Sequence, residues 1–236
     1  MCHNEGVYRA MNAVAFYSNT GESRAVAQFF AERLNYPLLN IEEVCPEIYQ
    51  NLVLIFPVHS QSVPHIVKRF LNSVKIENLT AIATYGKMCC GNVLQEIQKK
   101  YGFNVVGGAY IPTKHSYKGG ESFSDWDSLT PVLEKVNHPS PVMLPKLYKN
   151  PFASLLPNLR SRCNVKIYKT SGCNGCGVCA DNCHFNAISE GVTNGRCIRC
   201  LKCVNTCPNN ALKFKVRIPL KLYLRKEKMT KLIIYT

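Results

Sequence analysis

The sequence predicts an α/β protein in which a doubly wound, five-stranded parallel sheet is followed by a small α+β unit rich in cysteine. Two observations lead to this prediction. Five short apolar runs alternate with amphipathic helical patterns up to about residue 136, which is typical of a parallel sheet with helices on both faces. Eight cysteines then occur in two runs of identical spacing, Cys173 to Cys183 and Cys197 to Cys207.

Both cysteine runs have the form C-x2-C-x2-C-x3-C and align without a gap as an internal repeat. Three thiols within seven residues can surround a compact body, and a 4Fe–4S cube needs one thiolate for each iron. In this pattern the fourth cysteine of a run ligates the other cluster. The sequence therefore predicts two 4Fe–4S clusters, one held by Cys173, Cys176, Cys179 and Cys207 and the other by Cys197, Cys200, Cys203 and Cys183.

Structural zinc and a disulfide framework are the alternatives for these cysteines. Zinc usually takes two separated C-x2-C pairs rather than two quartets, and nothing in the sequence indicates secretion. The region resembles the bacterial two-cluster ferredoxins. Pro208 follows the second run as that pattern expects, whereas His184 stands where the first run would have proline. We expect an ordinary substitution at His184 rather than a histidine ligand, because the cysteine set is already complete.

Length and charge limit the class of protein. The chain has 236 residues, enough for two domains, and 13 cysteines. Because the N-terminus shows no signal peptide and no run approaches about 18 apolar residues, we expect a cytoplasmic protein without a transmembrane segment. Its cysteines should then be ligands and free thiols. The formal net charge of +14 predicts attraction to an acidic redox partner, while no nucleic-acid recognition motif is visible. The oligomeric state is not predicted.

The five expected strands are 13–17, 38–41, 52–56, 79–84 and 104–111. Helical patterns lie between them at 24–34, 64–74 and about 93–101, and a final helix should begin at Thr130, as its N-cap, and run to Val136. In such a sheet, ligands bind beyond the carboxyl ends of the strands. The three loops that follow the first, third and fourth expected strands are therefore the candidate binding loops.

The first loop has the composition of a phosphate site. Gly21 lets the backbone approach a ligand, the N–H groups and dipole of the following helix favour an anion, and hydroxyl groups add donors. The alternative is an ordinary capped helix that binds nothing. The form S-x-T-G-x-S resembles the FMN-phosphate loop of flavodoxins. The candidate residues of this loop are Ser18, Asn19, Thr20, Gly21, Glu22 and Ser23.

The other two loops are expected to flank the flavin ring, because the flavodoxin fold places FMN between its first and third strands. His59 and Tyr85 are candidates for stacking or edge contacts. In flavodoxin-like domains fused to ferredoxins an aromatic residue is expected where His59 stands. A degenerate, empty site is the alternative. The candidate residues are Pro57, Val58, His59 and Ser60 in the second loop and Thr84, Tyr85 and Gly86 in the third.

These patterns divide the chain into four segments. We expect an FMN-binding domain over residues 1–136, a proline-rich connector over 137–165, a two-cluster domain over 166–215 and a basic tail over 216–236. The connector should contain one short helix near 152–156. Residues 164–170 predict a strand, and residues 184–196 a hairpin-like loop between the repeats. From 214 to 224 apolar and basic residues alternate, which predicts an edge strand; this segment either docks to an acidic partner or membrane surface or is a solvated tail.

Four residues near the expected flavin have open roles. Cys89 and Cys90 could be redox-active, although a vicinal pair is more often two ordinary thiols. His115 and Tyr117 could reach the flavin edge, although exposed-loop residues are the expectation.

Nearly the whole chain resembles the flavodoxin–ferredoxin fusion proteins of anaerobes. This resemblance implies an electron-transfer protein in which FMN, able to exchange one or two electrons, is coupled to two one-electron clusters. No nucleophile or acid–base pair is visible. Three alternatives remain: a flavin-dependent reductase of a small molecule, a ferredoxin whose first domain is an empty docking module, and a redox sensor that binds nucleic acid.

Overall fold

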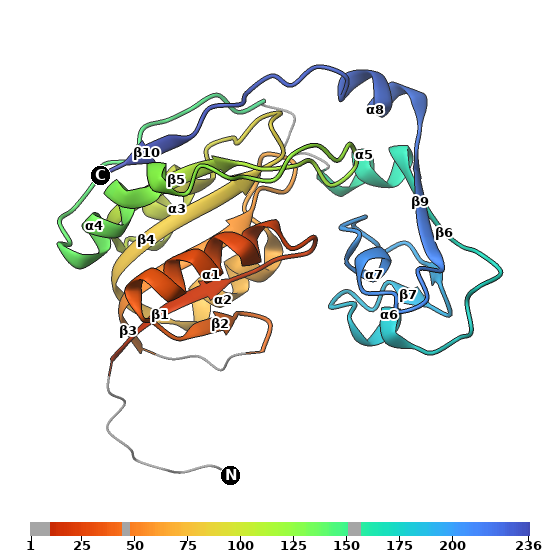
Figure 1. Cartoon of the computed structure of the whole chain (residues 1–236), viewed down its shortest axis with the longest axis horizontal. Coiled ribbons are helices and arrows are strands. Elements are labelled where there is room, and N and C mark those ends of the chain that lie inside the picture. The colour runs from red at the N-terminus through yellow and green to blue at the C-terminus, as the bar shows by residue number, and fades with distance from the viewer. Residues whose placement is uncertain (1–9, 44–47, 151–156) are drawn as a thin grey trace, which may run out of the picture.

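The computed structural model describes residues 10–43, 48–150 and 157–236. A six-stranded sheet with helices on both faces forms the larger unit, and a smaller unit of short helices and two-stranded ribbons lies beside it (Figure 1). The strand order in the sheet is β10-β5-β4-β3-β1-β2. The first five strands are parallel, and their order 2-1-3-4-5 is that of the flavodoxin-like doubly wound fold. The predicted fold class is confirmed.

All five predicted parallel strands form, and the central ones extend further than the apolar runs. β3 and β4 begin at Ile48 and Lys75, several residues before the expected starts, because sheet pairing extends into half-polar sequence. The elements of this unit are β1 (Met11–Phe16), α1 (Glu22–Leu34), β2 (Leu38–Asn40), β3 (Ile48–Pro57), α2 (His65–Ser73), β4 (Lys75–Tyr85), α3 (Val93–Tyr101), β5 (Asn104–Pro112), a 3-10 turn (Asp127–Leu129) and α4 (Thr130–Asn137).

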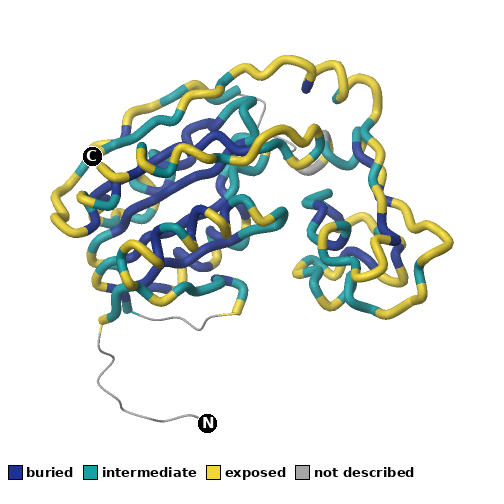
Figure 2. Tube along the Cα trace, in the orientation of Figure 1, coloured by how far each residue is buried: buried dark blue, intermediate teal, exposed yellow. Residues whose placement is uncertain are grey.

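Two hydrophobic cores sandwich the sheet. Val26 and Phe30 of α1 pack with Val132 of α4 on one face, and Phe70 of α2 packs with Leu94 of α3 on the other. The central strands are buried on both faces, as Figure 2 shows in dark blue, and this explains their continuous apolar sequence. Such a rigid sheet holds the loops at its carboxyl ends in fixed positions.

The sixth strand comes from the end of the chain. β10 (Ile233–Tyr235) pairs antiparallel with β5, with Ile233 opposite Tyr110. Figure 1 shows the C-terminal segment returning from the small unit to this edge of the sheet. The hydroxyl of Tyr85 donates to the carbonyl of Lys231 at 2.5 Å, which ties the returning segment to β4. The last residues of the expected tail are therefore part of the first sheet.

The small unit combines two ribbons with short helices. β6 pairs antiparallel with β9, and β7 pairs with β8, which forms the expected hairpin between the repeats. Within the described residues, no helix has the length and apolar character needed to cross a membrane. The elements are α5 (Pro157–Asn164), β6 (Val165–Lys169), α6 (Val178–Asp181), β7 (Ile188–Ser189), β8 (Val192–Thr193), α7 (Lys202–Asn205), β9 (Leu212–Val216) and α8 (Ile218–Tyr223).

Two local predictions are wrong. The strand expected over 214–224 ends at Val216, and α8 follows, because Pro219 can occupy the first turn of a helix but donates nothing to a ladder. Thr130 is the first residue of α4 rather than its N-cap, which is Leu129, because the preceding 3-10 turn already has helical geometry. The helix expected near 152–156 lies outside the described residues.

Candidate functional site: a cavity between the sheet and the cysteine-rich unit

A cavity of about 250 Å³ lies at the carboxyl end of the sheet, against the small unit. Of the thirteen predicted FMN residues, Gly21 is absent from its lining, and the others are Ser18, Asn19, Thr20, Glu22, Ser23, Pro57, Val58, His59, Ser60, Thr84, Tyr85 and Gly86. Sequence reasoning missed part of the wall. That part comes from the loop after β5, from α5, from the second cysteine run and from α8: Thr113, Lys114, Ser116, Ser161, Ile198, Arg199, Cys200, Leu220, Tyr223 and Leu224.

The start of α1 is suited to an anion. Gly21 is the N-cap with φ of 94°, and no side chain caps the first turn. The Gly21 N–H donates to Ser18 Oγ at 3.2 Å, which folds the loop back on itself. Because α1 lacks the side-chain cap of an ordinary helix start, the N–H groups of its first turn can serve a phosphate. This geometry favours the phosphate loop over the capped-helix alternative.

Ser23 and Glu22 have other partners in this structure. Ser23 is 2% exposed, and its hydroxyl lies 2.8 Å from Thr84 Oγ1, so the pair joins α1 to β4. Glu22 forms an ion pair of 3.0 Å with Lys114 and accepts a hydrogen bond from Ser122. The hydroxyl of Ser23 therefore supports the loop, and Lys114 offsets the negative charge that Glu22 brings to the cavity.

His59 lies where the second loop meets the first. Its Nε2 is 3.2 Å from Asn19 Nδ2, and its ring meets Tyr17 edge to face at 5.9 Å. Burial lowers the pKa of His59 to about 4, and burial together with Lys118 lowers the pKa of His115 to about 4. Both rings are therefore neutral near pH 7, and Nε2 of His59 accepts the hydrogen bond from Asn19.

These two histidines predict a loss of stability in mild acid. Between pH 6.5 and 4 the unfolded chain binds protons that the folded protein does not. The free energy of unfolding should therefore fall as the pH drops through this window, by up to about 1.4 kcal/mol per pH unit for each histidine. Urea unfolding at several pH values, followed by the fluorescence of Trp126, measures the slope. The variant His59→Gln/His115→Gln should flatten it, and an unchanged slope would contradict this origin.

Tyr85 lines the cavity but is largely buried, so its expected stacking or edge contact with a flavin stays a prediction. Its side chain is 2% exposed and packs in the core, with its hydroxyl bonded to Lys231. The ring is thus held beneath the third loop. Cys90 is also buried, and burial raises its pKa to about 12, which favours an inert thiol. Cys89 and Cys90 are both free thiols, and Cys89 lines the cavity.

Gly86 allows the loop after β5 to close on the third loop. A Cβ added at Gly86 would lie 2.6 Å from His115 Cδ2 and 3.0 Å from its Cα. We expect Gly86→Ala to displace the 113–120 loop, at an overpacking cost of roughly 1–3 kcal/mol, and to weaken FMN binding about tenfold or more. Titration of flavin fluorescence measures the affinity. Gly195→Ala is the control, because a Cβ there meets nothing within 4 Å; equal affinities in the two variants would contradict the prediction.

The structure gathers the eight cysteines into the two predicted sets. Cys183, Cys197, Cys200 and Cys203 line one cavity, and Cys173, Cys176, Cys179 and Cys207 line another. The thiols lie along the walls of these cavities, and among the described residues no three His, Cys, Asp or Glu side chains converge as for a single metal ion. The crossed pairing of the repeats is thus present in the geometry, while cluster ligation by these residues stays a prediction.

The two repeats share backbone geometry. Gly175 and Gly177 have positive φ in the first run, and Arg199 and Leu201, the aligned residues of the second run, also have positive φ. The N–H groups of Ala187 and Ala211 donate to Cys183 Sγ and Cys207 Sγ at 3.4 and 3.3 Å. Non-glycine residues rarely adopt this conformation. Its use at both positions indicates that the backbone winds around each cavity in the same way.

The raised pKa values of two of these thiols indicate that their thiolates need a positively charged group beside them. Burial, followed by the charges of neighbouring cysteines, raises the pKa of Cys203 to about 12, and burial raises that of Cys200 to about 11. Four thiolates cannot gather there without positive charge between them. An iron–sulfur core supplies that charge and deprotonates its ligands. Desolvation raises the pKa of Cys207, but backbone N–H donors, first that of Ala211, outweigh it and the pKa is lowered.

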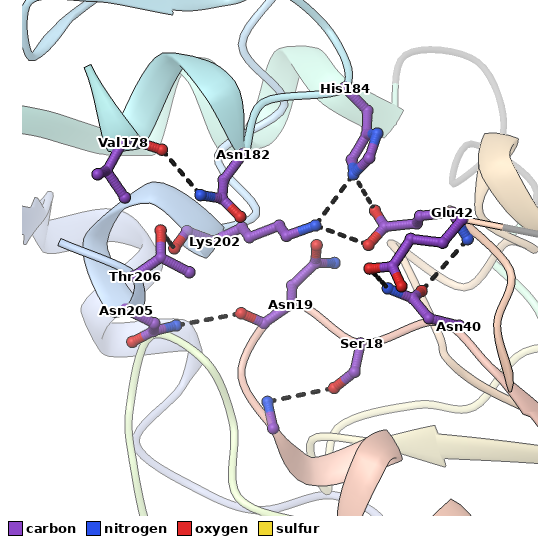
Figure 3. Close-up of polar contacts among 12 residues, drawn as sticks. Ser18, Asn19, Asn40, Glu42, Val178, Asn182, His184, Lys202, Asn205 and Thr206 are labelled. Carbon is purple, nitrogen blue, oxygen red and sulfur yellow. Dashed lines mark hydrogen bonds and ion pairs between the residues drawn. The ribbon is translucent and has the colours of Figure 1, made fainter. Parts of the chain in front are cut away.

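The two units meet through a buried carboxylate (Figure 3). Glu42, in the turn after β2, is 3% exposed at its side chain. Its two oxygens lie 2.6 Å from His184 Nε2 and 2.6 Å from Lys202 Nζ. Nearby, Asn205 Nδ2 donates to the backbone carbonyl of Asn19 at 3.3 Å. The histidine that replaces the expected proline thus joins the second cysteine set to the first domain. This contact corrects the expectation of an ordinary substitution.

The 113–120 loop makes a second contact between the units. The hydroxyl of Tyr117 donates to the carbonyl of Arg199 at 2.6 Å, and its ring lies 6.3 Å from that of Phe214. Tyr117 packs against the core of the small unit, and burial raises its pKa to about 12. The expectation of an exposed-loop residue is therefore wrong for Tyr117. The error arises because its burial comes from a unit distant in sequence.

Comparisons with known proteins found two family matches in the small unit and several solved structures of low identity. Residues 192–213 and 170–186 each match a family described as 4Fe-4S binding domain. No curated protein matches the chain. Among solved structures, an archaeal flavodoxin is 16% identical and covers 54% of this chain and 99% of its own, with a TM-score of 0.40. A flavoprotein candidate from Bacteroides uniformis is 19% identical and covers 45% of this chain and 92% of its own, with a TM-score of 0.39.

A third solved structure, the Trp repressor binding protein from Bacillus subtilis, is 16% identical with a TM-score of 0.35, and covers 53% of this chain and 94% of its own. The fold itself is carried by the strand order, and the small unit by the two family matches. The chain therefore combines a first unit with the flavodoxin-like strand order and a small unit that contains two matches to 4Fe-4S binding domains.

Proposed function

We propose that this protein transfers electrons between FMN, bound in the cavity at the carboxyl end of the sheet, and two 4Fe–4S clusters. One observation carries the proposal: the cavity lined by the three predicted flavin loops is also lined by Cys200, which belongs to the set of Cys183, Cys197 and Cys203. A flavin there would lie directly against a cluster. The domain boundaries at residues 136, 165 and 215 stay part of this proposal.

The residues present fit both groups. The first turn of α1 and the hydroxyl of Thr20 would hold the phosphate, while Lys114 offsets the nearby carboxylate of Glu22. Oδ1 of Asn19 is buried and lacks a hydrogen-bond partner within the described residues, so it can accept from a ligand. His59, neutral near pH 7, would contact the ring without adding charge. When bound, the flavin exchanges one or two electrons and each cluster one.

Composition after anaerobic reconstitution tests the proposal. About eight irons, eight sulfides and one FMN per chain are expected. Clusters without FMN, even after FMN is added, would leave a ferredoxin whose first domain serves only for docking. Zinc in place of iron and sulfide would overturn the interpretation of the cysteines. Turnover of a small molecule by the loaded protein would instead support the reductase alternative.

We also propose an acidic redox protein as the partner. The outward face of the β6–β9 ribbon supports this, because it presents Lys166 opposite Lys215 and Tyr168 opposite Lys213, all exposed. Lys213 lies close enough to Cys207 to lower the pKa of that thiol. A positive surface next to one cluster would attract an acidic partner to it.

Small inorganic oxidants test the charge of this surface. Once the rates are corrected for the intrinsic reactivity of each oxidant, the anion ferricyanide should oxidise the reduced protein faster than the cation hexaammineruthenium(III). Lys213→Glu/Lys215→Glu should slow ferricyanide about tenfold at low salt and speed the cationic oxidant. The difference should vanish near 1 M salt, where screening acts within about 3 Å. Lys75→Glu, at the other end of the sheet, is the control. Equal effects of the two substitutions would refute a local docking surface.

A further inference from the structure

We propose that the two clusters occupy unequal positions. The cluster of the inner set, Cys183, Cys197, Cys200 and Cys203, exchanges electrons with the flavin. The cluster of the outer set, Cys173, Cys176, Cys179 and Cys207, exchanges electrons with the partner. The proposal rests on the proposed function. Each step moves one electron, so the donor is oxidised by one and the acceptor reduced by one. Two successive one-electron transfers oxidise a fully reduced flavin and reduce two molecules of a one-electron protein acceptor. The protons of the reduced flavin are released to water.

Shared walls give the order of the sites. Asn19, Ile198 and Cys200 line both the flavin cavity and the cavity of the inner cysteine set. The cavity of the outer set shares no described lining residue with either. The sites therefore follow one another as flavin, inner set, outer set. The outer set remains close to the inner one, since Cys179 and Cys207 pack against the core cluster that contains Cys197 and Cys203.

Among the described residues, the polar contacts from the first unit to the cysteine runs lie beside the inner set. Tyr117 lines that cavity and donates to the carbonyl of Arg199, the residue before Cys200. Glu42 holds His184, the residue after Cys183, and Lys202. Figure 3 shows Glu42, His184 and Lys202 meeting beside the loop of Ser18 and Asn19. Tyr117 and Glu42 are thus positioning residues for the inner cluster.

The outer set is more exposed than the inner set, in which Cys197 and Cys203 are buried. Cys176 is exposed, and Gly175 beside it has open space around its Cα. The lysines of the ribbon face lie near the outer set, because Leu212, the residue before Lys213 in β9, lines the cavity of that set. An acidic partner could therefore approach the outer cluster without disturbing the flavin cavity.

Matched double variants test the order. Cys197→Ala/Cys203→Ala removes two inner thiols, and Cys173→Ala/Cys179→Ala removes the aligned outer ones; none of the four lines the flavin cavity. Each variant should keep about four irons. The readout is the fluorescence lifetime of bound FMN, which a nearby cluster shortens. The lifetime should lengthen several-fold in the inner variant and stay unchanged in the outer one. The reverse pattern would overturn the order.

A second measurement needs no variant and decides the matter if either variant loses all its iron. Hydrogen exchange of the cluster-loaded protein is compared with and without FMN. FMN should slow exchange at 113–118 and 198–201 and leave 173–177 unchanged. Protection at 173–177 without protection at 198–201 would overturn the inference. Absence of FMN binding is a separate outcome, seen in the flavin content, and would instead refute the proposed function.

Discussion

Removing the iron–sulfur clusters is expected to unfold the small unit, residues 164–216, while the six-stranded sheet stays folded. The core of the small unit contains few apolar side chains, among them Ile167, Ile188 and Leu212, and the rest of its core includes the cysteines themselves. Metal binding in such small domains contributes on the order of 10 kcal/mol to folding. The sheet has two larger cores of its own and needs no cluster.

Anaerobic chelation followed by hydrogen exchange measures this effect. Amides of the β6–β9 ribbon should lose their protection, and those of β3 and β4 should keep it. The fluorescence of Trp126, which stacks on Phe29 of α1 at 5.2 Å, should stay native and serves as the internal control. A ribbon that stays protected after iron is gone would show that the small unit folds without clusters.

Replacing Glu42 by alanine is expected to loosen the contact between the two units. The substitution leaves Lys202, 16% exposed at its side chain, without its carboxylate, and removes a contact of His184. Breaking a buried ion pair by removing one partner costs about 3–5 kcal/mol. Because Lys202 can partly reach water, we expect a cost of about 3 kcal/mol, the lower end of this range. Such a cost raises the population of molecules in which the two units have separated roughly 100-fold.

Hydrogen exchange at 182–185 and 201–206, together with the rate at which a chelator takes iron, measures the opening in Glu42→Ala. Hydrogen exchange and iron removal should both become faster. The half of the iron held by the inner set should be released before the rest, because that set adjoins the broken contact. Glu43→Ala is the matched control, since Glu43 is exposed and accepts only a local hydrogen bond from Asn40 among its described contacts. Equal behaviour of the two variants would show that Glu42 does not hold the units together.

Local sequence patterns predicted most of the first domain. The segments that form β1, β3, β4 and β5 are continuously apolar because both faces of the sheet are covered. Such runs can be recognised in the sequence alone. The 2-1-3-4-5 strand order then places the three loops at one edge, where twelve of the thirteen predicted residues line a single cavity. The spacing of the cysteines likewise anticipated the two sets that the fold brings together.

Predictions were wrong where distant segments meet. Tyr117 looked like an exposed-loop residue because nothing nearby in sequence shows that Arg199 and Phe214 cover it. His184 looked like an ordinary substitution because its partner Glu42 lies in the other unit. The alternating pattern after Phe214 suited a strand, but Pro219 begins α8 instead.

The sequence by itself determined the sheet, its binding edge and the crossed cysteine sets, because burial pattern, helix-start chemistry and ligand spacing are local properties of the chain. Only the tertiary structure decided which cysteine set adjoins the candidate flavin cavity. It also decided that the C-terminal strand β10 pairs with β5. Those features depend on contacts between segments far apart in sequence, such as Glu42 with Lys202 and β10 with β5. No local pattern encodes such contacts, because each partner alone shows nothing in the sequence about the other.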